Sequence, residues 1–232
     1  MGITALLFLI LFVNSKAVAS GEAPPLYESV LFVGDDRVAG PFGNAVDRYL
    51  RTIAVDVNTV AVCGSTADTW IGVSSDYAPS SCGFWQRNEE GQESVSKEVK
   101  RRLIPEELAK ANPDLTVIAL GTYMLNNSRE MENQRDAIGK ILNEVEKVAS
   151  KCIWIGPPRQ KKDPFAANLG AGVKTLKDIL KKRSCDFVDS SNLSTAEVIR
   201  SIEKLNRPSA KDVRELENVV PGSIGPPSQA PR

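Results

Sequence analysis

The sequence predicts an α/β fold, a three-layer αβα sandwich around a five-stranded parallel sheet in flavodoxin-like order. Five short apolar runs are separated by segments with the apolar spacing of amphipathic helices, and the runs end in glycine or polar residues. Strands that alternate with helices form parallel sheets with helices on both faces. The 232 residues, of which 42% are hydrophobic, suffice for one well-buried domain with short ends.

The apolar runs and the helical segments between them set the expected element bounds. The strands are expected at about Val30 to Val33, Thr59 to Val62, Leu115 to Leu120, Cys152 to Ile155 and Asp186 to Val188. The helices are expected at about Gly40 to Ile53, Ser96 to Ala111, Glu130 to Ser150, Pro164 to Lys182 and Thr195 to Leu205. Pro105 is expected to bend or divide the second of these helices.

Two segments break this alternation. Residues 64–97 are rich in Ser, Gly and Asp, and so long an irregular stretch in a compact domain predicts a functional loop or lid. Residues 206–232 are polar and contain repeated prolines, which predicts an irregular tail. The domain is therefore expected over residues 20–205.

The N-terminus has the pattern of an export signal. Ile3 to Val13 is a continuous apolar block, shorter than a membrane-spanning helix, and Ala17-Val18-Ala19 is a small-residue cleavage pattern. Residues 1–19 are thus predicted to be a signal peptide, with a periplasmic or secreted mature chain beginning near Ser20 or Gly21 and no transmembrane segment. An uncleaved anchor or a buried helix is the alternative.

Export gives the four cysteines a structural meaning, because an oxidising compartment permits disulfides. Cys152 and Cys185 each open an apolar run, so they lie side by side if those runs are neighbouring parallel strands. We therefore expect Cys152–Cys185 and Cys63–Cys82 among the three possible connectivities. Free buried thiols in a cytosolic protein are the alternative.

The composition argues against several classes of function. Lys+Arg and Asp+Glu balance at 29 each, which argues against a nucleic-acid-binding surface. The chain contains no histidine and has no evident carboxylate cluster, so no metal and no cofactor are expected.

Asp35 and Asp36 follow the first strand, at the sheet edge where α/β folds bind ligands. Adjacent residues on a strand point to opposite faces, so the two carboxylates are not expected to share a proton.

Several of these strand ends carry glycine. Gly34-Asp35-Asp36 follows the first strand, Gly64 the second and Gly121-Thr122-Tyr123 the third. With Gly40-Pro41-Phe42-Gly43, Cys63-Gly64 and Cys82-Gly83, this arrangement resembles an exported subgroup of the SGNH (GDSL-type) hydrolases over about residues 29–205. The resemblance implies the flavodoxin-like sandwich, and it implies that Asp35 faces inward and holds the turn after the first strand.

The resemblance also implies where catalytic residues should lie, and the chain departs from most of them. The nucleophilic serine falls on Asp36, the oxyanion glycine on Gly64 and the oxyanion asparagine on Tyr123, with Asn126 and Asn127 nearby. The family's Asp-x-x-His pair has no counterpart; Lys211 and Arg214 align best with it. Attack by an alcohol needs a base, and in this design the base is an imidazole. The inherited esterase mechanism is therefore not expected.

The sequence thus predicts a catalytically degenerate member that binds a ligand in the former active-site cleft. The resemblance implies an ester-bearing or acylated carbohydrate such as cell-wall polysaccharide or peptidoglycan. The expected ligand contacts are Asp36, Arg37, Gly64, Thr122, Tyr123, Trp70 and Trp85. The alternative is a carboxylate-dependent esterase or glycosidase that uses Asp36, with a second carboxyl from Asp189, Asp68 or Asp76.

Several of these residues have a second, purely structural interpretation. Trp70 and Trp85 could equally pack a small core beside a disulfide, and Arg37 could pair with Asp36 in a salt bridge. The basic run of residues 159–162 is expected to be a solvated loop. Asn126-Asn127-Ser128 and Asn192-Leu193-Ser194 match glycosylation acceptors, which matters in a eukaryotic source.

Overall fold

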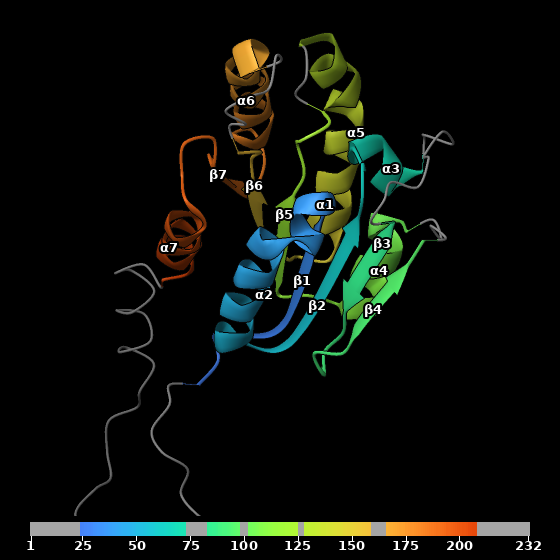
Figure 1. Ribbon diagram of the computed structural model, residues 1–232, viewed down its shortest axis with the longest axis vertical. Helices are drawn as coiled ribbons and strands as arrows, with labels where there is room; N and C mark the ends of the chain where they lie inside the picture. The colour runs from blue at the N-terminus through green and yellow to red at the C-terminus, as the bar shows by residue number, and fades with distance from the viewer. Residues whose placement is uncertain (1–23, 73–82, 98–101, 125–127, 159–165, 208–232) are drawn as a thin grey trace, which may run out of the picture.

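The computed structural model describes residues 24–72, 83–97, 102–124, 128–158 and 166–207, and it contains a seven-stranded sheet of order β4-β3-β2-β1-β5-β6-β7 (Figure 1). The strands are β1 (Tyr27–Gly34), β2 (Ala54–Val62), β3 (Phe84–Arg87), β4 (Glu93–Ser96), β5 (Leu115–Ala119), β6 (Lys151–Ile155) and β7 (Cys185–Val188). The predicted fold class is confirmed, but the sheet has seven strands rather than five.

The five predicted strands form the parallel part of the sheet, in the order β2-β1-β5-β6-β7. This is the flavodoxin-like order. Gly34 at the end of β1 lies beside Ala61 of β2 and Ala119 of β5. Ile155 at the end of β6 lies beside Val188 of β7. The carboxyl ends of these strands therefore form one edge of the sheet, as the site prediction requires.

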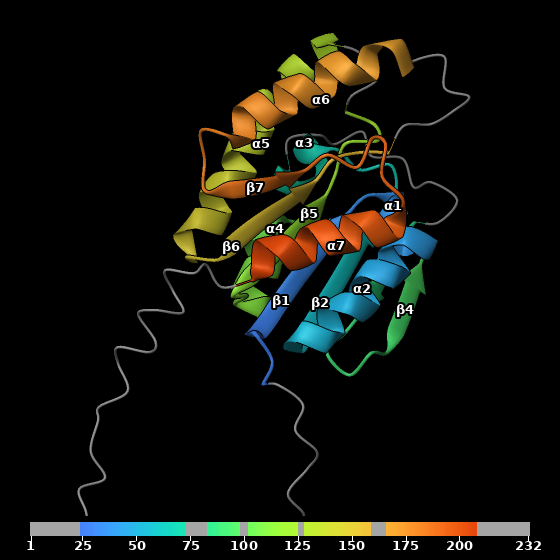
Figure 2. The same ribbon diagram turned by 90° about the vertical axis from the view of Figure 1, so that its left-hand side faces the viewer.

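Two helical layers cover the sheet because alternate strand residues point to opposite faces. The helices are α1 (Asp36–Ala39), α2 (Pro41–Ile53), α3 (Ala67–Ile71), α4 (Ile104–Ala111), α5 (Ser128–Lys147), α6 (Ala166–Leu180) and α7 (Thr195–Asn206). One core joins the sheet to α3, α4, α5 and α6, and a second joins it to α1, α2 and α7. Figure 2 shows α7 and α2 side by side in front of the strands, and these two helices contact each other.

The segment expected to be a lid loop, residues 64–97, differs from that expectation in its described parts. It contains α3 and an antiparallel hairpin of β3 and β4, and β3 pairs with β2, so that the hairpin extends the sheet. Residues 73–82 of the segment lie outside the described residues. β4 is polar and largely exposed, so it has no apolar alternation that would indicate a strand.

Long-range polar contacts attach this hairpin to α2. Asp47 of α2 is fully buried and accepts hydrogen bonds from Arg51 Nε (3.1 Å), Thr59 Oγ1 (2.6 Å) and Arg87 Nη1. Arg51 also donates to the carbonyl oxygens of Asn88 (2.8 Å) and Glu89 (2.9 Å) in the hairpin turn. A buried carboxylate needs such partners. The hairpin is therefore specified by residues distant in sequence.

Pro105 does not bend or divide a helix. It lies in the first turn of α4, where its missing N–H removes no intrahelical hydrogen bond and its fixed φ suits the helix start. The helix expected from Ser96 therefore begins at Ile104 in the structure, while residues 98–101 lie outside the described residues.

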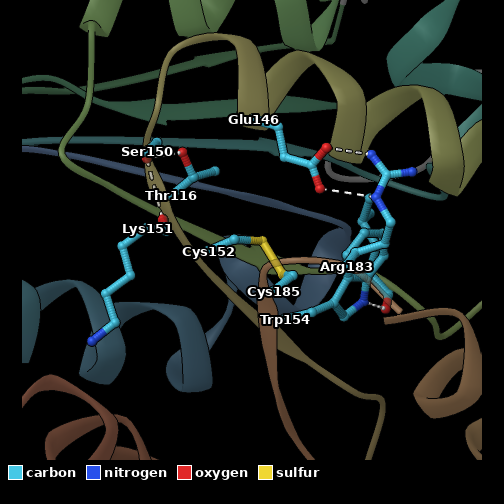
Figure 3. The surroundings of a disulfide bond; sticks show 9 residues. Thr116, Glu146, Ser150, Lys151, Cys152, Trp154, Arg183 and Cys185 are labelled. Atoms are coloured by element: carbon cyan, nitrogen blue, oxygen red, sulfur yellow. Dashed lines mark hydrogen bonds and ion pairs between the residues drawn. A yellow bond between two sulfur atoms is a disulfide. The ribbon is translucent and has the colours of Figure 1, made fainter. Parts of the chain in front are cut away.

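One predicted disulfide is confirmed. Cys152 of β6 and Cys185 of β7 are adjacent in the parallel register, with Cα atoms 4.4 Å apart, and their sulfur atoms are bonded (Figure 3). Cys63 is also disulfide-bonded. Cys82, its predicted partner, lies outside the described residues, so Cys63–Cys82 stays a prediction.

The chain ends fall outside the described residues as well. The predicted signal peptide of residues 1–19 and the tail beyond Arg207 therefore stay predictions. Within the described ranges, no helix has the length and apolar character needed to cross a membrane.

Candidate functional site

The turn after β1 builds the first part of the site. Gly34 is required there, because a Cβ atom at this position would lie 2.4 Å from the carbonyl oxygen of Ala119 on the neighbouring strand. Asp35 follows, fully buried, and its carboxylate accepts from the backbone N–H of Arg37 (3.1 Å) and of Thr122 (3.3 Å). Asp35 therefore caps α1 and ties β1 to the end of β5, which agrees with the inward-facing role that the resemblance implied.

Arg37 is fixed by the same turn. Its Nε lies 3.5 Å from Asp35 Oδ1, its Nη1 donates to the carbonyl oxygen of Gly156 (3.1 Å), and its guanidinium lies 5.2 Å from the centre of the Phe42 ring. Arg37 therefore pairs with Asp35, and the alternative in which it pairs with Asp36 is not found: the ion pair that Arg37 makes in the described part of the chain is with Asp35.

Burial shifts the pKa values of both Asp35 and Arg37. Burial raises the pKa of Asp35, and the nearby Arg37 opposes that rise. Burial likewise lowers the pKa of Arg37, and Asp35 opposes that change. Two charges held out of water in this way stabilise each other only while both are present. The turn is thus a rigid support for the residue between them.

That residue, Asp36, opens onto a cleft of about 400 Å³. The described residues that line the cleft are Asp36, Arg37, Gly40, Pro41, Phe42, Pro158, Ser190, Leu193, Thr195 and Val198. They come from α1, the start of α2, the segment after β6, and the β7–α7 connection with α7. The cleft therefore lies at the carboxyl edge of the sheet, on the side covered by α2 and α7.

A network of hydrogen bonds joins the walls of the cleft. The Gly156 carbonyl oxygen accepts from Arg37 and from the hydroxyl of Ser190, which is 2% exposed. The end of β6, the β7–α7 connection and α1 are thus held together at one backbone oxygen. Asp189 beside this network is exposed and accepts from the backbone N–H (3.0 Å) and hydroxyl (2.6 Å) of Ser191.

The other predicted strand-end residues are not part of this lining. Gly64 follows β2 with φ of 72°, a left-handed conformation that favours glycine. Thr122 and Tyr123 follow β5; Thr122 contacts Asp35 through its backbone, and Tyr123 is 39% exposed. The structure thus brings Asp36 and Arg37 together in the cleft and leaves Gly64, Thr122 and Tyr123 outside it.

The two tryptophans expected at the ligand are buried in the protein cores. Trp70 is fully buried, and its indole N–H donates to Ser65 Oγ (3.1 Å). Trp85 of β3 is 5% exposed, and the guanidinium carbon of Arg87 lies over its ring, 5.3 Å from the ring centre. Their structural interpretation therefore agrees with the structure, and neither lines the cleft.

The cleft contains a single carboxylate among its described lining residues, that of Asp36. Asp68 is held in α3 by Gln134 of α5, on the other face of the sheet, and accepts from its side-chain amide (2.5 Å). Asp76, Lys211 and Arg214 lie outside the described residues. The described ranges also contain no group of His, Cys, Asp or Glu that could hold a metal ion.

Sequence reasoning missed most of the cleft wall. Phe42, Pro158, Leu193 and Val198 are apolar residues that look like ordinary helix and loop positions in the sequence. One signal was present: Asp189-Ser190-Ser191 follows the last strand, as polar residues follow the first. Polar residues at the ends of two parallel strands share one edge of the sheet, which would have pointed to Ser190.

Comparisons with known proteins add little to this geometry. No family model and no curated protein matches the chain. Similar solved structures include a DUF4886 family protein from Bacteroides uniformis, with 10% identity, a TM-score of 0.46 and coverage of 71% of this chain and 67% of that one. A putative acylhydrolase from Bacteroides fragilis has 12% identity, a TM-score of 0.48 and coverage of 77% and 88%.

An acetylxylan esterase from Geobacillus stearothermophilus is similar to a comparable extent, with 13% identity, a TM-score of 0.44 and coverage of 76% of this chain and 80% of that one. At TM-scores below 0.5, none of these likenesses carries an argument about activity. The fold of this chain is an αβα sandwich whose parallel strands have the flavodoxin-like order.

Proposed function

We propose that this chain is an exported SGNH hydrolase-like pseudoenzyme that binds a cell-envelope carbohydrate or an acylated ligand in the cleft beside Asp36. One observation carries the proposal: a carboxylate lines the cleft where the resembled family has its nucleophilic serine, in a chain without histidine. Acyl transfer to an alcohol needs a base to accept its proton. The cleft offers contacts for a ligand without the groups for that reaction.

The composition of the cleft supports a binding role. Phe42, Pro158, Leu193 and Val198 form apolar walls, while Asp36 and Arg37 form a charged end. Ligand sites commonly combine an apolar lining with a few polar groups that fix orientation. An acyl chain or the C–H face of a sugar ring suits the walls, and hydroxyl or carbonyl groups suit the charged end. The disulfide Cys152–Cys185 supports an oxidising compartment.

A carboxylate-dependent hydrolase has less support. Glycoside hydrolysis needs a second carboxyl group about 5 to 9.5 Å from the first. Among the described lining residues Asp36 is the only acid, and the neighbouring Asp35 is engaged with Arg37.

The test combines binding with turnover. Purified protein is heated with soluble envelope oligosaccharides and acylated sugars, and the same ligands are followed for released acid. We expect a concentration-dependent rise in melting temperature, since a ligand at 100 times its Kd adds about 2.7 kcal/mol of stability. Leu193→Asp should abolish the shift by charging an apolar wall, whereas Leu26→Asp, at an exposed residue outside the cleft lining, should not.

The outcome that overturns the proposal is catalytic. Hydrolysis of an acetyl ester or glycoside that disappears in Asp36→Ala would show that the carboxylate is a catalyst. If no ligand raises the melting temperature, or if Leu193→Asp leaves that rise unchanged, the cleft is not the ligand site.

A further inference from the structure

We propose that the cleft holds the hydrocarbon chain of an acylated ligand, and that this chain, rather than a sugar ring, is the part of the ligand that enters. The inference rests on the proposed binding function and names the ligand group that the walls recognise. The geometry points to it because the floor of the cleft belongs to a hydrophobic core, whereas two of the four polar side chains in the described lining are nearly buried and bonded to other parts of the protein.

The floor of the cleft is apolar and continuous with that core. Val198 of α7 is 1% exposed and belongs to the core that joins the sheet to α1, α2 and α7. Phe42 of α2 and Leu193 before α7 are partly buried and pack against the same core. Pro41 and Pro158 add apolar surface closer to the solvent. A ligand that enters the cleft therefore meets hydrocarbon from both α2 and α7, and burying apolar surface there is favourable.

The polar side chains of the lining offer few hydrogen bonds to a ligand. Arg37 is 10% exposed and contacts Asp35 and the carbonyl oxygen of Gly156. Ser190 is 2% exposed and donates to the same carbonyl oxygen. The half-buried Asp36 and Thr195 remain, and one carboxylate oxygen of Asp36 is itself buried.

A sugar ring fits this lining poorly for that reason. Each ring carries several hydroxyl groups, and a hydroxyl that leaves water without a new partner costs free energy. A hydrocarbon chain has no polar group to satisfy, so the scarcity of exposed polar groups does not oppose its entry.

The cleft also has little aromatic surface on which a sugar ring could lie. Phe42 is the only aromatic residue among the described lining residues, and the guanidinium of Arg37 lies over its ring, 5.2 Å from the ring centre. Trp70 and Trp85, the aromatic residues that the sequence suggested for this contact, are buried in the cores. The walls thus favour a flexible apolar chain over a flat ring.

The volume of the cleft sets the expected length of the chain. A methylene group occupies about as much space as one water molecule in the liquid, about 30 Å³, so the cleft of about 400 Å³ holds on the order of ten carbon atoms. The inferred occupant is therefore an unbranched chain of medium length, with its head group left at the mouth of the cleft.

The test measures binding of alkyl glucosides, from methyl to dodecyl, by isothermal titration calorimetry below their micelle-forming concentrations. These probes share one head group and differ only in chain length. Each methylene added between hexyl and octyl should tighten binding about fourfold, and methyl glucoside should bind at least about a hundredfold more weakly than octyl glucoside. The gain should stop once the chain fills the cleft, at about ten carbons. The heat-capacity change of binding should become more negative along the series, as burial of apolar surface requires.

Two leucine variants locate the binding. Leu193→Asp charges an apolar wall of the cleft and should abolish the dependence of affinity on chain length. Leu26→Asp is the matched control, because Leu26 is exposed and lies outside the described lining, and it should keep that dependence. A measurement on the unaltered protein keeps the inference testable if Leu193→Asp does not fold: the methyl NMR signals of Leu193 and Val198 should shift with octyl glucoside and not with methyl glucoside.

The outcomes separate this inference from the binding proposal. Equal affinity for hexyl and octyl glucoside, with binding lost in Leu193→Asp, refutes the chain as the recognised group and leaves the cleft as a ligand site. Binding of soluble oligosaccharides in the cleft, when no alkyl glucoside binds, refutes it equally. A dependence on chain length that survives in Leu193→Asp places the chain elsewhere on the protein and also refutes it. If neither oligosaccharides nor alkyl glucosides bind, both proposals fail.

Discussion

Removal of the Cys152–Cys185 disulfide should destabilise the protein by an amount that the sequence separation of the two residues fixes. The bond closes a loop across 33 residues, and the loop-entropy relation gives about 3.7 kcal/mol at 25 °C for that length. The double variant Cys152→Ala, Cys185→Ala loses this constraint and also the packing of two sulfur atoms at residues 3% and 8% exposed. We expect a total loss of at least about 3 kcal/mol.

Urea unfolding followed by tryptophan fluorescence measures this loss, because Trp70, Trp85 and Trp154 are all buried in the folded protein. With a slope of about 2.5 kcal/mol/M, the midpoint should fall by about 1.2 to 1.5 M. Thr116→Val is a matched control on the neighbouring strand, since it removes the Thr116–Ser150 hydroxyl contact seen in Figure 3 and leaves the bond intact. It should shift the midpoint by less than half as much.

The location of the bond predicts a local effect too. β7 has four residues and is the last strand of the sheet, where β6 is its one pairing partner among the described residues. Amide hydrogen exchange in β7 should therefore accelerate more than exchange in β1. A midpoint shift below about 0.4 M, with β7 exchange unchanged, would refute the reasoning that the bond stabilises this edge.

Three further predictions concern the site and the hairpin. Asp36→Ser should give no acetyl-ester hydrolysis above the unaltered protein, measured with 4-nitrophenyl acetate, because no imidazole is present; rapid turnover would contradict the account of the site. Asp47→Ala should cost about 3 to 5 kcal/mol in urea unfolding, because Arg51 loses its counter-charge and Arg87 keeps only Glu93, and a loss under 1 kcal/mol would contradict a structural role. Burial raises the pKa of Asp47, but hydrogen bonds from Arg51, Thr59 and Arg87 outweigh it and hold that pKa below its usual value. The stability that Asp47 contributes is therefore present above the ordinary carboxyl pKa and lost as pH falls through the lowered pKa. In Asp47→Asn the urea midpoint should therefore fall less between pH 5 and pH 2 than it does in the unaltered protein. An equal fall of the midpoint in both proteins would contradict this account.

The parallel sheet could be predicted from sequence because each strand carries its own local signal. The β1 residues Val30 to Val33 are all fully buried, and the run is apolar throughout, as a strand covered on both faces requires. The cysteine pair followed from the same logic, since residues at corresponding positions near the starts of neighbouring parallel strands lie side by side, as Cys152 and Cys185 do. The hairpin had no such signal: Glu93–Ser96 is exposed and polar, and its position depends on Arg87, Arg51 and Asp47.

The site could be predicted only in part, for a related reason. Asp36 and Arg37 are placed by the strand end that precedes them, which the sequence marks clearly. Leu193 and Val198 reach the same cleft through the packing of α7 beside α2, a tertiary contact with no local signature. Trp70 and Trp85 illustrate the converse, because large aromatic residues in a polar segment suggested ligand contacts and instead fill the cores.

The division of labour within Asp35-Asp36-Arg37 has a consequence for how this scaffold can change. The outer two residues hold the backbone through contacts with Thr122, Gly156 and each other, and none of those contacts involves the side chain between them. Position 36 can therefore exchange one functional group for another while its frame keeps the same shape. The recess beside it would keep its walls through such an exchange, because its other lining residues are held by contacts that do not involve this side chain.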